Sequence, residues 1–148
     1  MAVGQDSDLD NLCYYDARPC AYNGLFAAYT YDLLPGYYPF KFFGELAALG
    51  ECAAISGLPA GVYAVAATDG KKHAAMLTRF MDESEIGASA EEITLSLGLA
   101  SDKNYIAHIQ TVENNAPIEK RPLAIGKEGS TQISLPMYSI AFIEIEEA

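Results

Sequence analysis

The sequence predicts a mainly β protein: an antiparallel β-sandwich of about eight strands, preceded by an aromatic-rich strand–loop–helix segment. Two observations support this. After residue 50, apolar and polar side chains alternate with period two in short runs separated by turn residues, which is typical of a sandwich. Before it, aromatic residues are dense: 11 of the 16 Tyr and Phe residues lie between residues 14 and 43. We therefore expect two units, residues 1–50 and residues 51–148.

The first unit begins with a polar, acidic stretch. Residues 11–16 (NLCYYD) are predicted to form a short buried strand, and residues 17–36 a loop that contains the turn signals Arg18-Pro19, Asn23-Gly24 and Pro35-Gly36. The stretch from Leu25 to Leu34 is apolar and aromatic, which is unusual for a solvated loop. We expect it to pack against something.

Residues 39–49 form the best helix in the sequence. Pro39 suits the first helical position, and Gly50 suits the C′ position that ends the helix. The 3.6-residue period predicts that the buried face contains Phe40, Phe43, Leu46 and Ala47, widened by Phe42 and Leu49. Gly44 is expected to let another backbone approach the helix.

The second unit is read as strands. Val62–Ala67 and Lys72–Phe80 flank an Asp69-Gly70 hairpin turn. The other predicted strands share a run of apolar residues between turn signals: residues 52–56, 93–99, 105–112, 123–125, 131–135 and 137–145. No convincing helix is expected after Gly50.

Composition excludes several function classes. The net charge is −11, with 9 basic and 20 acidic residues, which argues against nucleic acid and against docking on anionic lipid. No apolar run is long enough to span a membrane, and no signal peptide is visible. A neutral carbohydrate ligand remains compatible with this charge.

The three cysteines fit neither a disulfide framework nor a zinc motif, so free, mostly buried thiols in the cytoplasm are expected.

The candidate site residues are Tyr15, Asp16, Arg18 and Asn23, because a carboxylate and a guanidinium stand among aromatics where a strand is predicted to end. Asp16 could contact a ligand, or it could pair with Arg18 or the backbone and fix the turn. Glu45 beside Lys41 reads as structural, and Asp32 could be a turn residue.

Other reactive residue types are isolated in the sequence. His73 and His108 are expected to be half-buried strand residues, and no metal or cofactor is expected. Cys13 and Cys20 have no nearby base and are expected to be core thiols. The sandwich contains few aromatics, most of them expected to point inward, so a stand-alone sugar-binding module has weak support: Tyr63, Phe80, Tyr105, Tyr138 and Phe142.

Three stretches of the first unit carry a resemblance: Tyr14–Pro19, Tyr22–Phe26 and Gly36–Leu46. They resemble the end of the catalytic barrel, with its last strand, loop and helix, in bacterial β-xylosidase-like (family 39-like) glycoside hydrolases. The hairpin around Asp69 resembles the start of the β-sandwich that follows the barrel in those enzymes. The resemblance implies that Asp16 and Arg18 line the edge of a sugar pocket, in a supporting role. The catalytic glutamate pair of such enzymes lies on earlier barrel strands, which this sequence does not contain.

Three hypotheses follow. The first is a non-catalytic C-terminal portion of a glycoside hydrolase-like protein. The second is a free-standing carbohydrate-binding module. The third is self-association through residues 14–49, whose aromatic surface would be exposed unless the sandwich or a second copy of the chain covers it.

Overall fold

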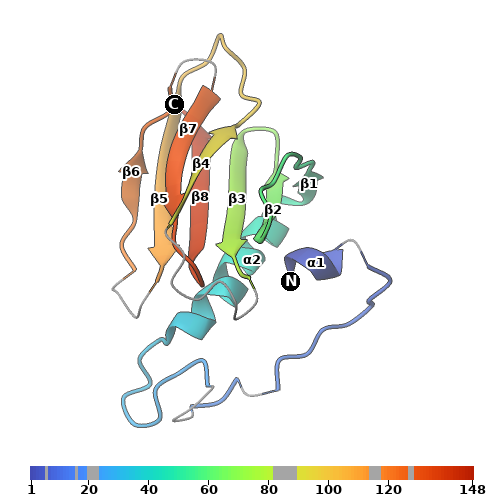
Figure 1. Ribbon diagram of the computed structural model, residues 1–148, viewed down its shortest axis with the longest axis vertical. Helices are drawn as coiled ribbons and strands as arrows, with labels where there is room; N and C mark the ends of the chain where they lie inside the picture. Colours follow the sequence, from blue (N-terminus) through green and yellow to red (C-terminus); the bar gives the residue numbers. More distant parts are fainter. Residues whose placement is uncertain (6, 16, 20–23, 82–89, 114–117, 127–128) are drawn as a thin grey trace.

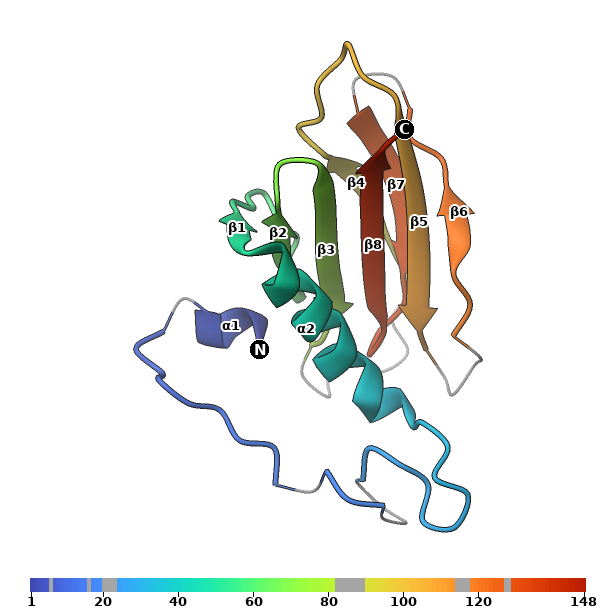
Figure 2. The same cartoon turned by 180° about the vertical axis from the view of Figure 1, so that it is seen from behind.

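The computed structural model describes residues 1–148 except 6, 16, 20–23, 82–89, 114–117 and 127–128. Within these residues, eight strands form two antiparallel sheets that face each other, and a helix covers the outer face of the larger sheet (Figures 1 and 2). The predicted mainly β, sandwich-like architecture is therefore confirmed. In chain order the elements are α1 (Ala2–Gln5), η1 (Pro35–Tyr37), α2 (Tyr38–Leu49), β1 (Glu51–Ala53), β2 (Val62–Thr68), β3 (Lys72–Arg79), β4 (Glu91–Ser96), β5 (Tyr105–Val112), β6 (Arg121–Leu123), β7 (Ser130–Leu135) and β8 (Ile140–Glu147).

The larger sheet has the strand order β1-β2-β3-β8-β5-β6, and the smaller sheet pairs β4 with β7. Strands β2 and β3 form the predicted hairpin, in which Thr68 pairs with His73. The last strand, β8, inserts between β3 and β5 and pairs with both along almost its whole length. Because β8 lies between β3 and β5, it joins the β1-β2-β3 part of the sheet to the β5-β6 part.

One hydrophobic core lies between the two sheets. Leu77 of β3 and Ile143 of β8 face Ile93 of β4 and Leu135 of β7, and all four are at most 6% exposed. Successive strand residues point to opposite faces, so the neighbours Met76 and Phe142 lie on the other side of the sheet. The larger sheet is thus apolar on both faces.

The second core lies between that other face and α2. The Phe42 side chain is fully buried and its ring stacks on Phe142, with 4.5 Å between centroids and 3° between planes. Leu46, one turn further, is 2% exposed. The predicted helix face is therefore wrong in detail: its centre is Phe42 and Leu46, and Ala47 is exposed. The spacing of Phe42, Leu46 and Leu49 is the i, i+4, i+7 pattern of one stripe.

The ends of α2 follow the sequence signals. The helix begins at Tyr38 with Pro39 in its first turn, and it ends at Leu49, which is followed by Gly50 with a φ of +90°. Gly44 does not serve a close backbone approach as expected, since a Cβ built there meets no atom within 4 Å. The boundary near Gly50 stays a prediction, although α2 shares a hydrophobic cluster with the sheet.

Several predicted strands are shorter or shifted. Residues 11–15 form no strand and are exposed, because no other strand pairs with them in the described part of the chain. β8 begins at Ile140 rather than at residue 137, since Tyr138 has a φ of +58° that no strand accommodates. β1 ends at Ala53, and β4 ends before Leu97 and Leu99. The strand predicted at residues 123–125 is instead Arg121–Leu123.

Candidate functional site

The structure places only two of the four predicted site residues. Tyr15 is 96% exposed, and Arg18 is also at the surface, whereas Asp16 and Asn23 lie outside the described residues. Tyr14, next to Tyr15, packs edge-on against Phe40 near the start of α2, with ring centroids 5.1 Å apart. The described part of this stretch is thus held against the helix on one side and open to solvent on the other.

The following stretch forms a compact loop. The backbone N–H of Leu34 donates to the carbonyl of Leu25 over 3.0 Å, and that of Ala27 donates to the carbonyl of Asp32 over 2.9 Å. Asp32 also accepts a hydrogen bond from the Thr30 hydroxyl, so its carboxylate bonds within the loop. The tip displays Tyr29 and Tyr31, which are 94% and 67% exposed.

Ring contacts connect this loop to the core. Phe26 contacts Tyr37, Tyr37 contacts Tyr38, and Tyr38 contacts Phe42, with centroids 5.6 to 5.9 Å apart. We call residues 14–49 the aromatic segment. Figure 1 shows that its part ahead of α2 extends beyond the end of the sheets. The sandwich therefore covers one face of α2 but leaves the loop tyrosines uncovered.

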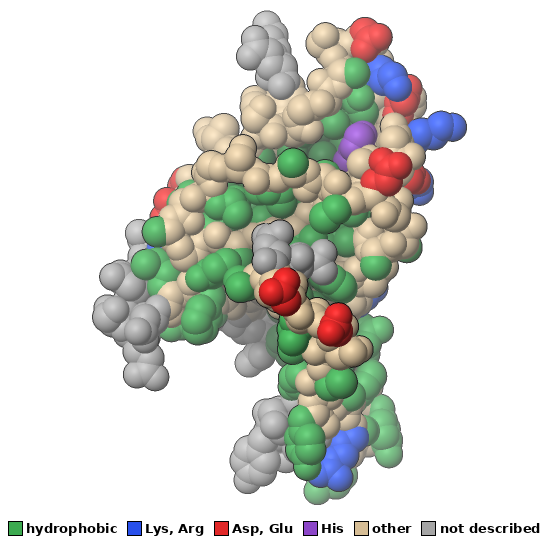
Figure 3. All heavy atoms as spheres, turned by 90° about the vertical axis from the view of Figure 1, so that its right-hand side faces the viewer, with side chains coloured by type: hydrophobic (Ala, Val, Ile, Leu, Met, Phe, Trp, Pro, Cys, Tyr) green, Lys and Arg blue, Asp and Glu red, His purple; other side chains and the backbone are tan. Residues whose placement is uncertain are grey.

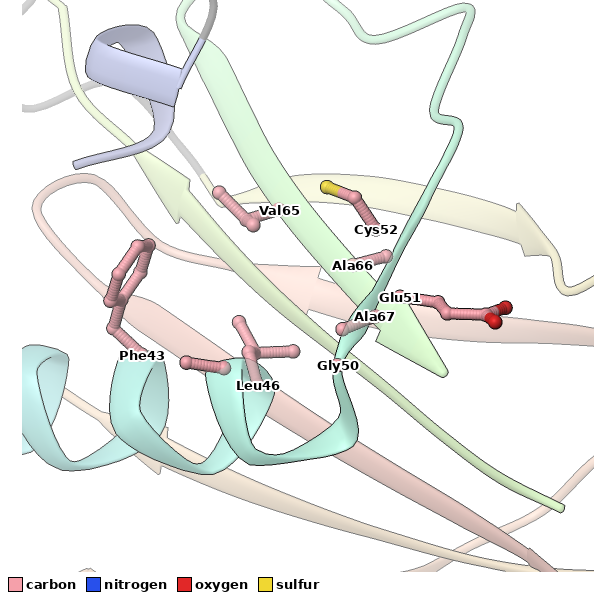
Figure 4. A pocket seen from close by; sticks show the side chains of 9 residues that line it. Phe43, Leu46, Gly50, Glu51, Cys52, Val65, Ala66 and Ala67 are labelled. Carbon is pink, nitrogen blue, oxygen red and sulfur yellow. The ribbon is translucent and has the colours of Figure 1, made fainter. Parts of the chain in front are cut away.

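A small groove lies where α2 meets the edge of the larger sheet (Figure 4). Its volume is about 210 Å³, and Phe43, Leu46 and Val65 make its walls mainly apolar. Cys52 lies at its rim, while the carboxylate of Glu51 points away from Phe43 and Leu46. Glu51 belongs to the same lining, but its carboxylate is directed away from the Cys52 sulfur, so the groove offers apolar contact rather than nucleophilic chemistry.

A second cavity, of about 310 Å³, lies at the end of the sandwich where β5 begins. Its lining is more polar and contains Ser101, Lys103, Asn104 and Tyr105. The Lys103 ammonium is already bonded to Glu147 over 2.8 Å. That ion pair raises the pKa of Lys103, chiefly through the hydrogen bond to Glu147, so this lysine is unsuited to act as a base at neutral pH.

The isolated reactive residues are placed as follows. His73 and His108 are half-buried on β3 and β5, as predicted. Cys13 and Cys52 are free but exposed, which corrects the expectation of buried thiols, and Cys20 lies outside the described residues. In the part of the chain that the structure describes, no three His, Cys, Asp or Glu side chains cluster to hold a metal ion. None of the described helices is long and apolar enough to cross a membrane.

The shifted pKa values belong to surface pairs. Backbone N–H groups of Lys72 and Lys71 donate to the Asp69 carboxylate and lower its pKa. The hydrogen bond and charge of Glu146 raise the pKa of Lys72 across the β3–β8 pair. Each shift stabilises the charged form on an exposed turn or strand end. These groups stabilise local structure, and neither pKa is shifted towards neutral pH as acid–base catalysis would require.

The aromatic residues of the sandwich correct another expectation. Most were predicted to point inward, yet Phe80 is 59% exposed, Tyr138 50% and Tyr63 39%. Phe142 is buried and Tyr105 is half-buried. Their positions in the sequence could have indicated this exposure, because Phe80 directly follows a strand end and Tyr138 follows Pro136 in a turn.

No protein-family model and no curated protein matches the sequence. Solved structures do match. The family 30 subfamily 8 xylanase Xyn30A from Clostridium acetobutylicum aligns with 84% of this chain at a TM-score of 0.59 and 16% identity. A family 30 endoxylanase from Clostridium papyrosolvens C71 aligns with 83% at 0.60 and 18%. The arabinose-bound family 51 α-L-arabinofuranosidase MgGH51 aligns with 85% at 0.52 and 18%.

These alignments cover only 31%, 30% and 22% of the three enzymes, so this chain spans less than a third of each. At such identities the likeness concerns the fold. The narrower family 39-like resemblance is not confirmed by them. What they establish is that the chain folds like a part of several glycoside hydrolase structures.

Proposed function

We propose that this chain is the non-catalytic β-sandwich portion of a glycoside hydrolase-like protein and supports a sugar-hydrolysing barrel. The observation that carries the proposal is the structural match. It extends over more than four fifths of this chain but less than a third of each of the three enzymes. A piece with that relation to a larger enzyme is more readily a supporting part than the reaction centre.

The placement of the acidic side chains supports the same proposal. Glycoside hydrolysis uses two carboxyl groups that flank one sugar bond. In the described part of the chain, five glutamates form ion pairs with basic side chains: Glu45 with Lys41, Glu91 with Arg79, Glu144 with Lys120, Glu146 with Lys72 and Glu147 with Lys103. Three of these pairs involve β8, one lies within α2 and one joins β3 to β4, and each carboxylate is matched with a cation, which favours a structural use of the charges.

The finer part of the proposal concerns the aromatic segment and keeps the family 39-like assignment. In a complete enzyme of that kind, Tyr15, Asp16, Arg18 and Asn23 would belong to the loop after the last barrel strand. Such loops build the sites of these barrels. The exposure of Tyr15 and Arg18 is compatible with a place at the edge of a sugar pocket.

The proposal is tested by assaying the purified chain on aryl β-xylosides and aryl α-L-arabinofuranosides. We expect no turnover above that of a Glu91→Gln, Glu45→Gln double variant, which alters two carboxylates that the structure assigns to ion pairs. Turnover by the wild-type chain that resists repeated purification would overturn the non-catalytic role.

A second candidate function, self-association through the aromatic segment, is favoured by the exposure of its tyrosines. Tyr15, Tyr29 and Tyr31 are 96%, 94% and 67% exposed. Residues 14–49 contain three acidic and two basic residues, so charge repulsion between copies is weak there although the chain carries −11 in all. Large exposed apolar surfaces mark interfaces.

Sedimentation over a wide range of protein concentration distinguishes the two candidates. If copies associate through this segment, replacing Tyr15, Tyr29 and Tyr31 together by Ser should shift the protein to monomer without changing its far-UV circular dichroism. A wild-type chain that is monomeric at every concentration would rule self-association out and leave the hydrolase proposal untouched.

A further inference from the structure

The turn between β2 and β3 contains a pair of residues that is chemically reactive in water. Asp69-Gly70 is the one Asp-Gly pair of the sequence. In such a pair the main-chain nitrogen of glycine can attack the aspartate side chain, because glycine has no side chain to obstruct the approach. Asp69 and Gly70 are both exposed, so water reaches them. Figure 1 places this turn at the upper end of the larger sheet, whereas the loop ahead of α2 projects beyond the lower end.

The reaction of such a pair has two steps, and water is its co-reactant. First, the glycine nitrogen forms a bond to Cγ of the aspartate, and its proton leaves with the carboxyl OH as water, which closes a succinimide ring. Water then adds to the ring. Attack at Cγ restores aspartate, whereas attack at the main-chain carbonyl carbon gives isoaspartate, whose main chain runs through Cγ. The product has the mass of the original chain but one more carbon in its main chain.

In the folded turn the attacking nitrogen is held by a hydrogen bond. The Gly70 N–H donates to Oγ1 of Thr68 over 2.9 Å. The Thr68 hydroxyl itself donates to the carbonyl of Lys72 over 2.9 Å and lies 3.0 Å from Nδ1 of His73. Attack on Asp69 requires the Gly70 peptide group to rotate and to lose its proton. The bond to Thr68 opposes both changes.

The carboxyl group under attack is held as well. Oδ1 of Asp69 accepts the backbone N–H of Lys72 over 2.7 Å and that of Lys71 over 2.9 Å. The Asp69 N–H donates to the carbonyl of Lys72 over 3.2 Å, which closes the turn. Ring closure expels a carboxyl oxygen as water and therefore needs the protonated acid. Because the bonds from Lys72 and Lys71 lower the pKa of Asp69, the folded turn contains little of that form.

We propose that Asp69 is a site of isoaspartate formation that the folded turn keeps closed, with the Thr68 hydroxyl as the group that closes it. Conversion then occurs in molecules whose turn has opened, at a rate set by the open population. The added main-chain carbon displaces the carboxylate that binds the N–H groups of Lys71 and Lys72, so the converted hairpin is weaker. Each conversion therefore leaves a lasting mark of turn opening. Isoaspartate formation is independent of sugar chemistry, so its failure leaves the proposed function untouched.

The first comparison is between the folded and the unfolded chain. The full chain is incubated in one mildly acidic buffer, with and without guanidinium chloride, and isoaspartate at residue 69 is quantified by peptide mapping with electron-transfer fragmentation. Mapping is required because Asn23-Gly24 also yields isoaspartate, through deamidation. We expect conversion to be more than about tenfold slower in the folded chain, because the hydrogen bonds of the turn must break first. Equal rates, or no isoaspartate at residue 69 in the unfolded chain, would overturn the proposal.

The second comparison tests the role of the Thr68 hydroxyl. Thr68→Val keeps the branched side chain but removes the acceptor of the Gly70 N–H, and it should speed conversion of the folded chain by about fivefold. Thr78→Val is the matched control: it removes a hydroxyl of β3 that donates to the carbonyl of Ser139 over 2.9 Å, far along the hairpin from the turn. This control should convert like the wild type.

Circular dichroism and thermal unfolding show whether both variants are folded. A Thr68→Val chain that converts at the wild-type rate would remove Thr68 from the proposal. Equal acceleration by Thr78→Val would also contradict it, since conversion would then follow global unfolding rather than opening of the turn. If Thr68→Val does not fold, the comparison of the folded and unfolded wild-type chain still decides whether the turn is closed.

Discussion

The sandwich and the part of the aromatic segment ahead of α2 are both rich in large apolar side chains, yet they use them in opposite ways. In the sandwich, Leu77, Phe142 and Ile143 are at most 2% exposed. In the segment, Tyr15 and Tyr29 are more than 90% exposed. The strands place alternate residues on two covered faces, whereas neither sheet covers the tip of the loop before α2, where Leu25 is buried but Tyr29 and Tyr31 are exposed. A core forms here where alternating apolar residues face a second layer of structure, and a high aromatic content alone does not create one.

Helix α2 is the junction between these two regions. Its Phe42 belongs to the core of the sandwich, and the contact of Phe40 with Tyr14 belongs to the segment. Figure 3 shows hydrophobic side chains along the narrow projecting part as well as on the main body. The comparison therefore shows a folded scaffold that carries an exposed aromatic surface.

The largest expected effect tests this difference directly. Phe42→Ala removes a fully buried ring stacked on Phe142 and should lower the free energy of unfolding by about 3–5 kcal/mol. Tyr29→Ala, the matched aromatic deletion in the loop, should change it by no more than about 0.5 kcal/mol. Urea unfolding measures both. Similar losses would mean that the loop is part of the core.

A smaller loss of stability is expected from substitution of Gly61, whose carbonyl accepts the backbone hydrogen bond of Phe80. Its φ is +74°, and a Cβ built there lies 2.3 Å from Cγ of Met81. Gly61→Ala should destabilise by more than about 1 kcal/mol, through backbone strain and steric overlap. The control is Gly57→Ala, at a similar φ of +72° but with no atom within 4 Å, which should cost less. Equal losses of thermal stability in the two variants would show that the Met81 side chain moves aside at no cost.

Substitution of Gly44 is expected to raise the stability of the protein rather than lower it. It lies exposed within α2, and a Cβ there meets no atom within 4 Å. Gly44→Ala should stabilise the protein by about 0.5–1 kcal/mol, because alanine loses less backbone entropy in a helix. Urea unfolding provides the measurement. A destabilisation would indicate that another surface approaches this face of the helix.

The smallest effect concerns pH and the hairpin turn. The backbone bonds from Lys72 and Lys71 lower the pKa of Asp69 below its ordinary value of 3.8. Because the folded pKa is the lower one, this stabilisation is complete above the unfolded value and is lost as pH falls through the folded value. Urea midpoints of wild type and Asp69→Asn, followed from about pH 6 to about pH 2, should converge on acidification. A constant difference would contradict the assignment.

Much of the fold could be predicted because it depends on local pattern. Alternation located the strands, Asp69-Gly70 located the hairpin, and Pro39 and Gly50 bounded the helix to within a residue. The insertion of β8 between β3 and β5 depends on distant pairing, which no local signal specifies. The late start of β8 results from a left-handed tyrosine, for which sequence preference would have chosen glycine.

The candidate site was less predictable than the fold. Tyr15 and Arg18 are at the surface as a ligand-contacting role requires, but exposure alone does not identify a ligand, and Asp16 and Asn23 lie outside the described residues. The contact between the exposed rings of Phe80 and Tyr138 could not be found from the sequence because the two residues are 58 positions apart and meet only through the β3–β8 pairing.

The central claim is that the sandwich with α2 forms one core, whereas the stretch ahead of α2 is an aromatic surface that this core leaves uncovered. Amide hydrogen exchange of the isolated chain tests it most directly. We expect β2, β3, β5 and β8 to be protected together up to the global stability, and the amides of residues 7–15 to exchange orders of magnitude faster. Equal protection of both regions in the monomer would contradict the account, since the stretch ahead of α2 would then be part of the same core.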